Sequence, residues 1–207
     1  MAETNPNSRL EAFCDGVFAI ALTLLIIDIK IPSTEKINTT ADLWLALKHI
    51  APSIFAFVLS FTIILITWVN HHNCLKLINK SCASFIYSNG FLLLTVVFIP
   101  FPTSLLGEYI STNHSAPAVI LYNAVLAINS IGWILICSAA LKNQLAKSEK
   151  AALKIRMNGK FGYFATALYS LCAIIAIWFP LVIAIVTTLT WIFWLIYGIN
   201  IKHEEMN

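Results

Sequence analysis

The chain has 207 residues, of which 59% are hydrophobic and only 11% carry a charge. Soluble domains usually have about a quarter of their residues charged, so this composition excludes a soluble globular protein and predicts one with several membrane crossings. The net charge of +3 is modest, and its basic excess lies in one segment. This pattern indicates membrane orientation and lipid-headgroup contact rather than nucleic-acid binding.

In chain order, apolar stretches separated by polar segments predict an all-α membrane protein with six transmembrane helices. Pro32 closes the first helix, and Pro100 and Pro102 end the third or bend its exit. The last apolar stretch, 161–201, is too long for one crossing, so we take Pro180 to divide it. The predicted helices lie within a single domain, 1–207, and cover residues 9–31, 43–70, 81–98, 116–141, 161–178 and 180–201.

The positively charged residues predict the orientation of these helices. With both termini cytoplasmic, the inner segments hold ten lysines and arginines, six of them in the predicted loop 142–160. The outer connections hold three, Lys30, Lys36 and Lys48. This is the bias that the positive-inside rule describes.

The first helix is unusual because its uncharged part, 16–27, has only twelve residues between Asp15 and Asp28. At about 1.5 Å per residue it spans roughly 18 Å, well short of a hydrocarbon core of about 30 Å. Carboxylates at that depth are costly in lipid unless they are paired or wetted. We therefore expect this helix at the centre of a bundle, shielded by the other helices and touching water on one side.

Four side chains of the first helix fall within about 100° of one another on a helical wheel: Ile20, Thr23, Leu24 and Ile27. Such a stripe suits helix packing. It also suits a narrow conduction path that closes by dewetting and offers the Thr23 hydroxyl to a partly dehydrated ion. Asp28, at the edge of the stripe, either concentrates cations at the outer mouth or balances Lys30.

Two polar clusters are expected to meet at the inner membrane face, one from the start of the first helix and one from the end of the second: Arg9, Phe13, Cys14, Asp15, Trp68, Asn70, His71 and His72. A buried Asp15 needs hydrogen-bond donors, so we interpret the set as a structural network. Adjacent histidines diverge by about 100° on a helix, which argues against metal binding with Asp15. Proton sensing by a histidine is a secondary alternative.

The sequence contains no motif of a hydrolase or a nucleotide-binding enzyme. A glycine-rich serine elbow, His-Glu-x-x-His, a phosphate-binding loop and Cys-x-x-Cys are all absent, and the five cysteines form no metal or disulfide spacing. We therefore predict that the protein is not an enzyme and has neither a cofactor nor a bound metal.

The segment Arg-Leu-Glu-Ala-Phe-Cys-Asp at 9–15 resembles the Arg-x-x-x-Phe-Ser-Asp signature of the transmembrane protein 175 family, which comprises the lysosomal potassium channel and its prokaryotic relatives. Cys14 stands where the signature has serine. The resemblance implies a potassium-permeable channel whose pore is lined by the first helix of each repeat. Because this chain has one repeat, it resembles the prokaryotic form, which implies a homotetramer in a bacterial inner membrane.

The resemblance also implies roles for individual residues, counted from Asp15: a constriction at Ile20, a selectivity-linked hydroxyl at Thr23, and pore-facing aliphatic side chains at Leu24 and Ile27. The signature is expected to pack against Trp68 and either His71 or His72. We predict passive conduction with modest preference for potassium over sodium, since a Thr-Val-Gly-Tyr-Gly filter is absent. The alternative is a secondary transporter that couples a proton or ion through Asp15 and His71 or His72.

Overall fold

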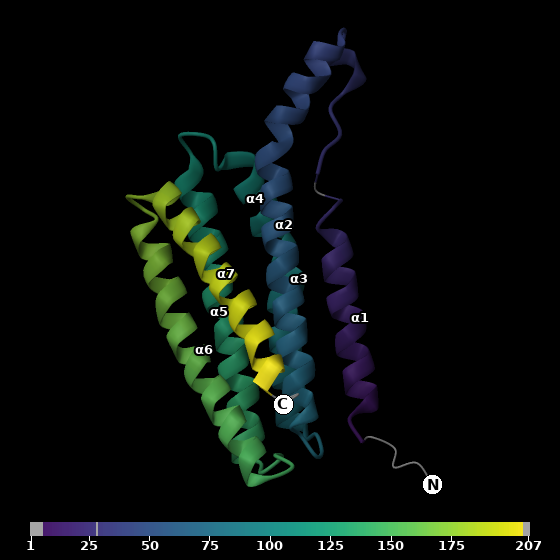
Figure 1. Ribbon diagram of the computed structural model, residues 1–207, viewed down its shortest axis with the longest axis vertical. Helices are drawn as coiled ribbons and strands as arrows, with labels where there is room; N and C mark the ends of the chain where they lie inside the picture. The colour runs from purple at the N-terminus through teal and green to yellow at the C-terminus, as the bar shows by residue number, and fades with distance from the viewer. Residues whose placement is uncertain (1–5, 28, 205–207) are drawn as a thin grey trace.

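The computed structural model describes residues 6–27 and 29–204, which are helical apart from short connections. The α-helices are labelled in Figure 1 and run as α1 (Ser8–Leu24), α2 (Thr40–Lys76), α3 (Ala83–Phe98), α4 (Pro100–Tyr109), α5 (Ser115–Lys142), α6 (Glu149–Ile175) and α7 (Pro180–Glu204). A single 3-10 turn, η1 (Thr34–Lys36), precedes α2. Because α3 and α4 follow one another as one rod, the described residues form six helical rods, as predicted.

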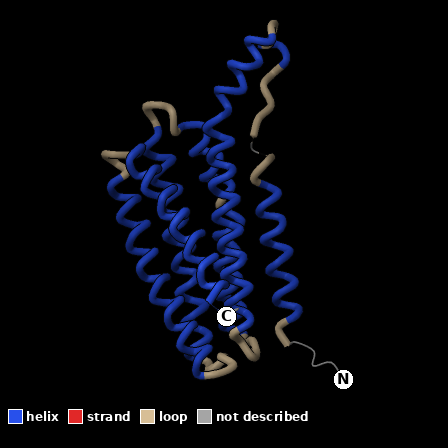
Figure 2. The backbone as a smooth tube through the Cα atoms, in the orientation of Figure 1, coloured by secondary structure: helices blue, strands red, loops and turns tan. Residues whose placement is uncertain are grey.

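Three of these rods are long and apolar enough to cross a membrane: Thr40–Lys76, Ala83–Tyr109 and Ser115–Lys142. Within α7, Pro180–Leu195 forms a shorter apolar helical segment. Figure 2 shows most of the connections at the two ends of the bundle, whereas residues 29–39 run up beside α2 before that helix begins. Backbone groups inside a bilayer must be satisfied within their own segment, and uninterrupted helices meet that requirement.

The end of the first helix and the start of the second differ from the predicted boundaries. α1 ends at Leu24 and passes into tight turns in which the Ile27 amide donates to the Leu24 carbonyl, whereas the prediction extended it to residue 31. The reason is the run of β-branched isoleucines before Pro32, which disfavours helix. α2 begins at Thr40 on a capping box, because Thr39 Oγ1 accepts from the Asp42 amide and the Asp42 carboxylate accepts from the Thr39 amide.

Three further boundaries also differ from the prediction. α2 continues through the polar segment after residue 70, because His71, Cys74 and Leu75 keep the helical spacing of its buried face. Pro100 does not end the third rod, since a proline in the first turn of a helix needs no amide proton. The predicted basic loop is mostly helix, because Ser148 Oγ accepts from the Ala151 amide and so starts α6.

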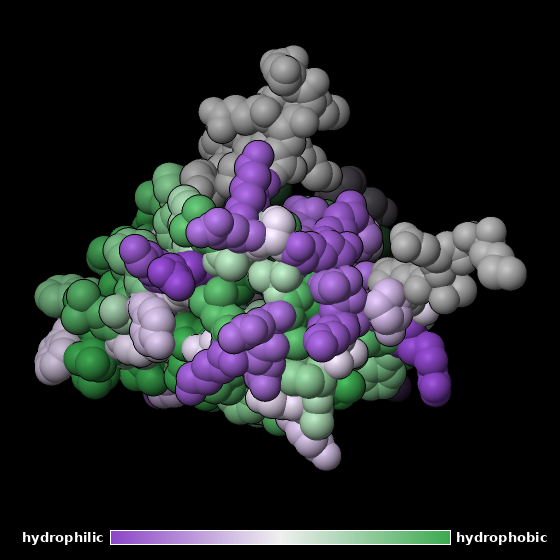
Figure 3. All heavy atoms as spheres, turned by 90° about the horizontal axis from the view of Figure 1, so that it is seen from below, coloured by the Kyte–Doolittle hydropathy of each residue, from purple (hydrophilic) through white to green (hydrophobic). Residues whose placement is uncertain are grey.

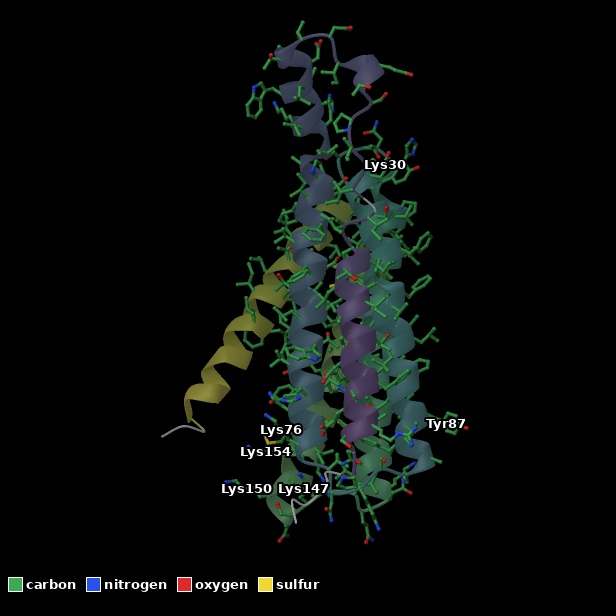
Figure 4. All side chains as sticks on the ribbon, turned by 90° about the vertical axis from the view of Figure 1, so that its right-hand side faces the viewer. Lys30, Lys76, Tyr87, Lys147, Lys150 and Lys154 are labelled. Carbon is green, nitrogen blue, oxygen red and sulfur yellow. The ribbon has the colours of Figure 1, made fainter. Side chains whose placement is uncertain are left out.

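Helix α1 lies at one edge of the protomer, packed mainly against α2 and α3 (Figure 1). Seen from that side, α1 runs in front of the protomer between α2 and the α3–α4 rod (Figure 4). The prediction that the first helix is central was therefore wrong for the single subunit. The sequence indicates that this helix avoids lipid. It does not indicate whether the helix is shielded by its own subunit or by a neighbouring copy.

The interior is closely packed and contains paired polar groups. Gly107 of α4 meets α2 so closely that an added Cβ would lie 2.7 Å from the Ser53 Cα. Ser60 Oγ of α2 lies 2.6 Å from Thr103 Oγ1 of α4 and 3.0 Å from the Tyr122 hydroxyl oxygen of α5. Small residues allow close helix approach, and interhelical hydrogen bonds join transmembrane helices, so these contacts fix α2, α4 and α5 against one another.

The two ends of the bundle are unlike one another. α1 begins and α7 ends on the lower side in Figure 1, while the upper turns of α2 project beyond the other helices. This projecting segment carries exposed apolar side chains, including Trp44, which is 70% exposed. The lower end carries short connections, of which 77–82 and 143–148 lie side by side.

Candidate ion pathway

One face of α1 is fixed in the protomer core. Three of its side chains and that of its C-cap residue, spaced at four, three and four residues, are at most 2% exposed: Cys14, Phe18, Ala21 and Leu25. This spacing keeps them on a single side of a helix. They pack with side chains of α2, α3 and α5 in the main hydrophobic cluster, so the orientation of α1 about its own axis is determined by burial.

The opposite face of α1 is uncovered in the protomer. Ile20 is 59% exposed, Leu24 is 38% exposed, and Thr23 is exposed between them. Ile27, in the turn that follows α1, is 71% exposed. All four belong to the stripe identified on the helical wheel. The stripe therefore points away from the subunit that carries it, toward whatever lies beyond α1.

The hydroxyl of Thr23 has a defined direction. Thr23 Oγ1 donates a hydrogen bond of 2.8 Å to the Ile20 carbonyl, one turn earlier on the same helix. Because the hydroxyl proton is used in this bond, the oxygen can offer its lone pairs outward. Asp28, proposed for the outer mouth, lies outside the described residues.

Asp15 is held by α2. The Trp68 indole Nε1 donates a 2.8 Å hydrogen bond to Asp15 Oδ1, across the contact between the two helices. The His72 ring stacks on Trp68, with ring centroids 6.1 Å apart and an angle of 23° between the planes. This stack steadies the indole and hence the donor that faces the carboxylate.

His71 belongs to a different set of contacts, deeper in the protomer. It is 1% exposed, and its Nε2 lies 2.7 Å from Asn89 Oδ1 of α3. Asn89 Nδ2 donates to the Phe85 carbonyl, so Asn89 Oδ1 is the acceptor and His71 Nε2 is the donor. His71 Nδ1 has no hydrogen-bond partner among the residues that the structure describes. Phe18 of α1 packs on the same ring with centroids 5.4 Å apart.

The predicted inner network is therefore only partly formed within one subunit. Trp68 and His71 contact α1 directly, whereas His72 stacks on Trp68 within α2. Arg9, Phe13 and Asn70 were expected in the same network but are exposed, Phe13 at 63%. Their positions on the helices turn them away from the α1–α2 contact, so within one subunit they do not join Trp68 and His71. Cys14 is fully buried among apolar side chains.

The described residues contain no group of three or more histidines, cysteines, aspartates or glutamates that could hold a metal ion. Asp15 and His71 also have different hydrogen-bond partners, Trp68 and Asn89. The polar groups at this end of α1 thus connect helices in pairs. Their geometry fits a role in fixing α1 in place.

Sequence reasoning missed Asn89 and the two aromatic residues beside His71, Phe18 and Trp133. Asn89 carried a usable signal, because an amide inside an apolar helix must find a partner within the protein. Its partner could not be read from the sequence, since α2 and α3 are separated by a turn that sets which side chains face each other.

The fold and composition thus define a polytopic α-helical membrane protein, and comparison with known proteins gives its family. Residues 9–100 match the family described as the endosomal/lysosomal potassium channel TMEM175. A potassium channel of Streptomyces collinus is 38% identical over 167 residues, which cover 77% of this chain and 80% of that protein. A potassium channel of Chamaesiphon minutus is 45% identical over 123 residues, which cover 59% of this chain and 60% of that protein.

A solved structure agrees with these sequence matches. The crystal structure of a TMEM175 homologue from Chamaesiphon minutus, described as a lysosomal potassium-selective channel homologue, superposes with a TM-score of 0.83 at 31% identity. The superposition covers 94% of this chain and 99% of that chain. The chain belongs to the TMEM175 family of potassium channels. The family consists of ion channels and not of enzymes, as the sequence predicted.

Proposed function

We propose that the chain is one subunit of a homotetrameric potassium channel of a bacterial inner membrane, with a pore lined by four copies of α1. The observation that carries this proposal is the uncovered stripe of α1 opposite a fully buried face. A lipid-facing α1 would hold Asp15 beside acyl chains, because the uncharged helical part, 16–24, is only about 14 Å long. If α1 instead faces a water-filled axis, Asp15 stays clear of lipid and the cost of placing its carboxylate beside acyl chains is removed.

Ile20 forms the tightest ring of this pore. Four isoleucine side chains at one level make an apolar neck, which conducts when wetted and closes when water leaves it. Leu24 and Ile27 extend the apolar lining toward the outer mouth. The direction of Ile20, 59% exposed on the free face of α1, supports this role.

Thr23 supplies the oxygen ligands next to the neck. Its hydroxyl proton is engaged by the Ile20 carbonyl, so four hydroxyl oxygens would present lone pairs to a potassium ion that has lost part of its water. Potassium is the permeant ion in this mechanism, and no cofactor takes part. At the outer end, Asp28 would raise the local cation concentration.

The lower end of the bundle is the cytoplasmic side in this proposal. Lys76, Lys147, Lys150 and Lys154 lie there, while Lys30 lies at the opposite end (Figure 4). The excess of lysine at one end supports the orientation with both termini inside. The Asp15–Trp68 bond and the His71 contacts then fix the inner half of the pore helix.

Ion flux from proteoliposomes tests the proposal. Purified protein is reconstituted, and flux is followed under a potassium gradient and then under a sodium gradient. We expect a greater flux of potassium, with a larger leak of both ions after Ile20→Ser because a polar ring keeps the neck wet. Ile185→Ser is the matched control, since Ile185 is 61% exposed on α7, whereas α1 packs mainly against α2 and α3.

Equal leak from the two isoleucine variants would remove Ile20 from the pathway. Flux that saturates and needs a gradient of a second solute would instead identify a transporter. Crosslinking of the reconstituted protein reports the oligomeric state independently, and a monomer that conducts would contradict a pore on a four-fold axis.

A further inference from the structure

Two connections that are far apart in the sequence are joined at the lower end of the bundle. Ile78, after α2, and Ala146, after α5, form an isolated antiparallel bridge. The Asn79 amide donates to the Leu145 carbonyl at 2.8 Å, and the Lys147 amide donates to the Leu77 carbonyl at 2.9 Å. The bridge holds the end of α2 beside the start of α6.

The bridge brings four lysines together, which we call the basic face: Lys76, Lys147, Lys150 and Lys154. Three of them are exposed and Lys154 is half-buried. Seen from below, hydrophilic side chains cover much of this end of the molecule (Figure 3). Glu149 lies among them in the first turn of α6, where the helix dipole favours an acid.

Directly beyond the basic face, α6 exposes large apolar side chains. Leu153 is 56% exposed and Met157 is 54% exposed, three and seven residues after Lys150 and on the same side of the helix. Phe164 follows two turns later at 60% exposure. A row of cations next to a row of apolar side chains matches the boundary between the headgroups and the acyl chains of a membrane leaflet.

We propose that the basic face binds the headgroups of anionic phospholipids. The lysines would contact the headgroup phosphates, while Leu153 and Met157 would contact the acyl chains. A soluble anion would use only the lysines, so the exposed apolar row favours a lipid. Each lysine near an anionic membrane surface strengthens binding about fivefold, so two of them should matter measurably.

The basic face is also connected to α1. The buried Asn7, just before α1, donates from its Nδ2 to the Ile78 carbonyl at 3.2 Å, on the bridged connection itself. Lipid bound at the basic face would therefore steady the structure that holds the lower end of α1. An effect of this on ion flux rests on the proposed function, whereas lipid binding itself does not.

Native mass spectrometry of the delipidated protein tests the binding. Phosphatidylglycerol, phosphatidylcholine and inorganic phosphate are added separately to wild type, to K147Q/K150Q and to K30Q/K48Q. The last variant removes two exposed lysines from the other end of the bundle and is the matched control. We expect K147Q/K150Q alone to bind phosphatidylglycerol at least roughly tenfold more weakly, with little phosphatidylcholine bound by any variant.

Equal binding of phosphatidylglycerol by all three proteins would overturn the proposal. Saturation of the same lysines by inorganic phosphate at comparable concentration would also overturn it, in favour of a soluble anion. L153S/M157S keeps every charge and should weaken binding of phosphatidylglycerol but not of phosphate. In vesicles, phosphatidylglycerol should raise flux through wild type but not through K147Q/K150Q. A protein that binds lipid yet never conducts would contradict only the proposed function.

Discussion

The indole of Trp68 donates a hydrogen bond of 2.8 Å to the carboxylate of Asp15, and so ties α2 to the helix that carries the exposed stripe. Both residues are half-buried, and each lies in a helix whose neighbouring residues pack in the core. The bond therefore fixes the inner half of α1 along α2 at one register. Loss of the indole donor should weaken the attachment of α1 to α2 without creating a cavity in the core.

Trp68→Phe keeps an aromatic ring but leaves the Asp15 carboxylate without this donor. A hydrogen bond to a charged group is worth about 1.5–3 kcal/mol, and partial exposure reduces the expected loss to about 1 kcal/mol. Thermal unfolding followed by circular dichroism measures it. Trp178→Phe is the control, because Trp178 is 65% exposed in the connection between α6 and α7. Equal melting temperatures for the two variants would show that the bond contributes nothing.

Thr23→Val replaces the hydroxyl by a methyl group of nearly the same size. If four hydroxyl oxygens replace part of the hydration shell of potassium, potassium flux should fall about tenfold or more, since 1.4 kcal/mol corresponds to a factor of ten. Thr23→Ser should keep most of the flux. Thr62→Val is the control, because the Thr62 hydroxyl also donates to a carbonyl of its own helix but lies on α2. A Thr23→Val channel with normal flux would refute the ligand role.

Asn89→Leu removes the acceptor of the buried His71 Nε2–H. A buried donor left unpaired costs about 1–3 kcal/mol, so the free energy of unfolding should fall by that amount. Chemical denaturation in detergent measures the change. Ser88→Ala serves as the control, because Ser88 is half-buried one position earlier and bonds only its own helix. Stability equal to that of Ser88→Ala would mean that His71 finds another acceptor.

Gly107→Ala and Gly90→Ala should have opposite effects on stability. At Gly107 the new Cβ would lie 2.7 Å from the Ser53 Cα, so α2 and α4 must separate at a cost of about 1–3 kcal/mol. At Gly90 nothing lies within 4 Å of the new Cβ. Alanine there should stabilise α3 by about 0.5–1 kcal/mol. Melting temperatures of the two variants relative to wild type give both signs, and destabilisation by both would contradict the packing described.

Most of the helical plan could be predicted because the apolar stretches are long and prolines separate several of them. Two of the errors have a common cause, which is that polar or charged residues were taken as helix ends. His71 lies in a polar segment, yet it continues the buried face of α2 together with Cys74 at helical spacing. The N-cap at Ser148 was also missed, because the charged residues that follow it were interpreted as a loop.

The face of α1 that carries Ile20 and Thr23 could be predicted from the wheel because it depends only on helical geometry. The position of α1 at the edge of the subunit could not, since it depends on which helices pack on the other side. The pairing of His71 with Asn89 was hidden for the same reason. Contacts between helices require the turn geometry that brings them together.

The projecting upper turns of α2 have a consequence for access to the pore. In the proposed tetramer, four such segments would stand near the outer mouth, each with the capping box of Thr39 and Asp42 at its projecting end. Hydrated ions would pass between these segments, whereas folded proteins and bulky polymers would be kept away from the outer mouth. These segments would thus exclude large molecules by size, independently of any selection among ions within the channel.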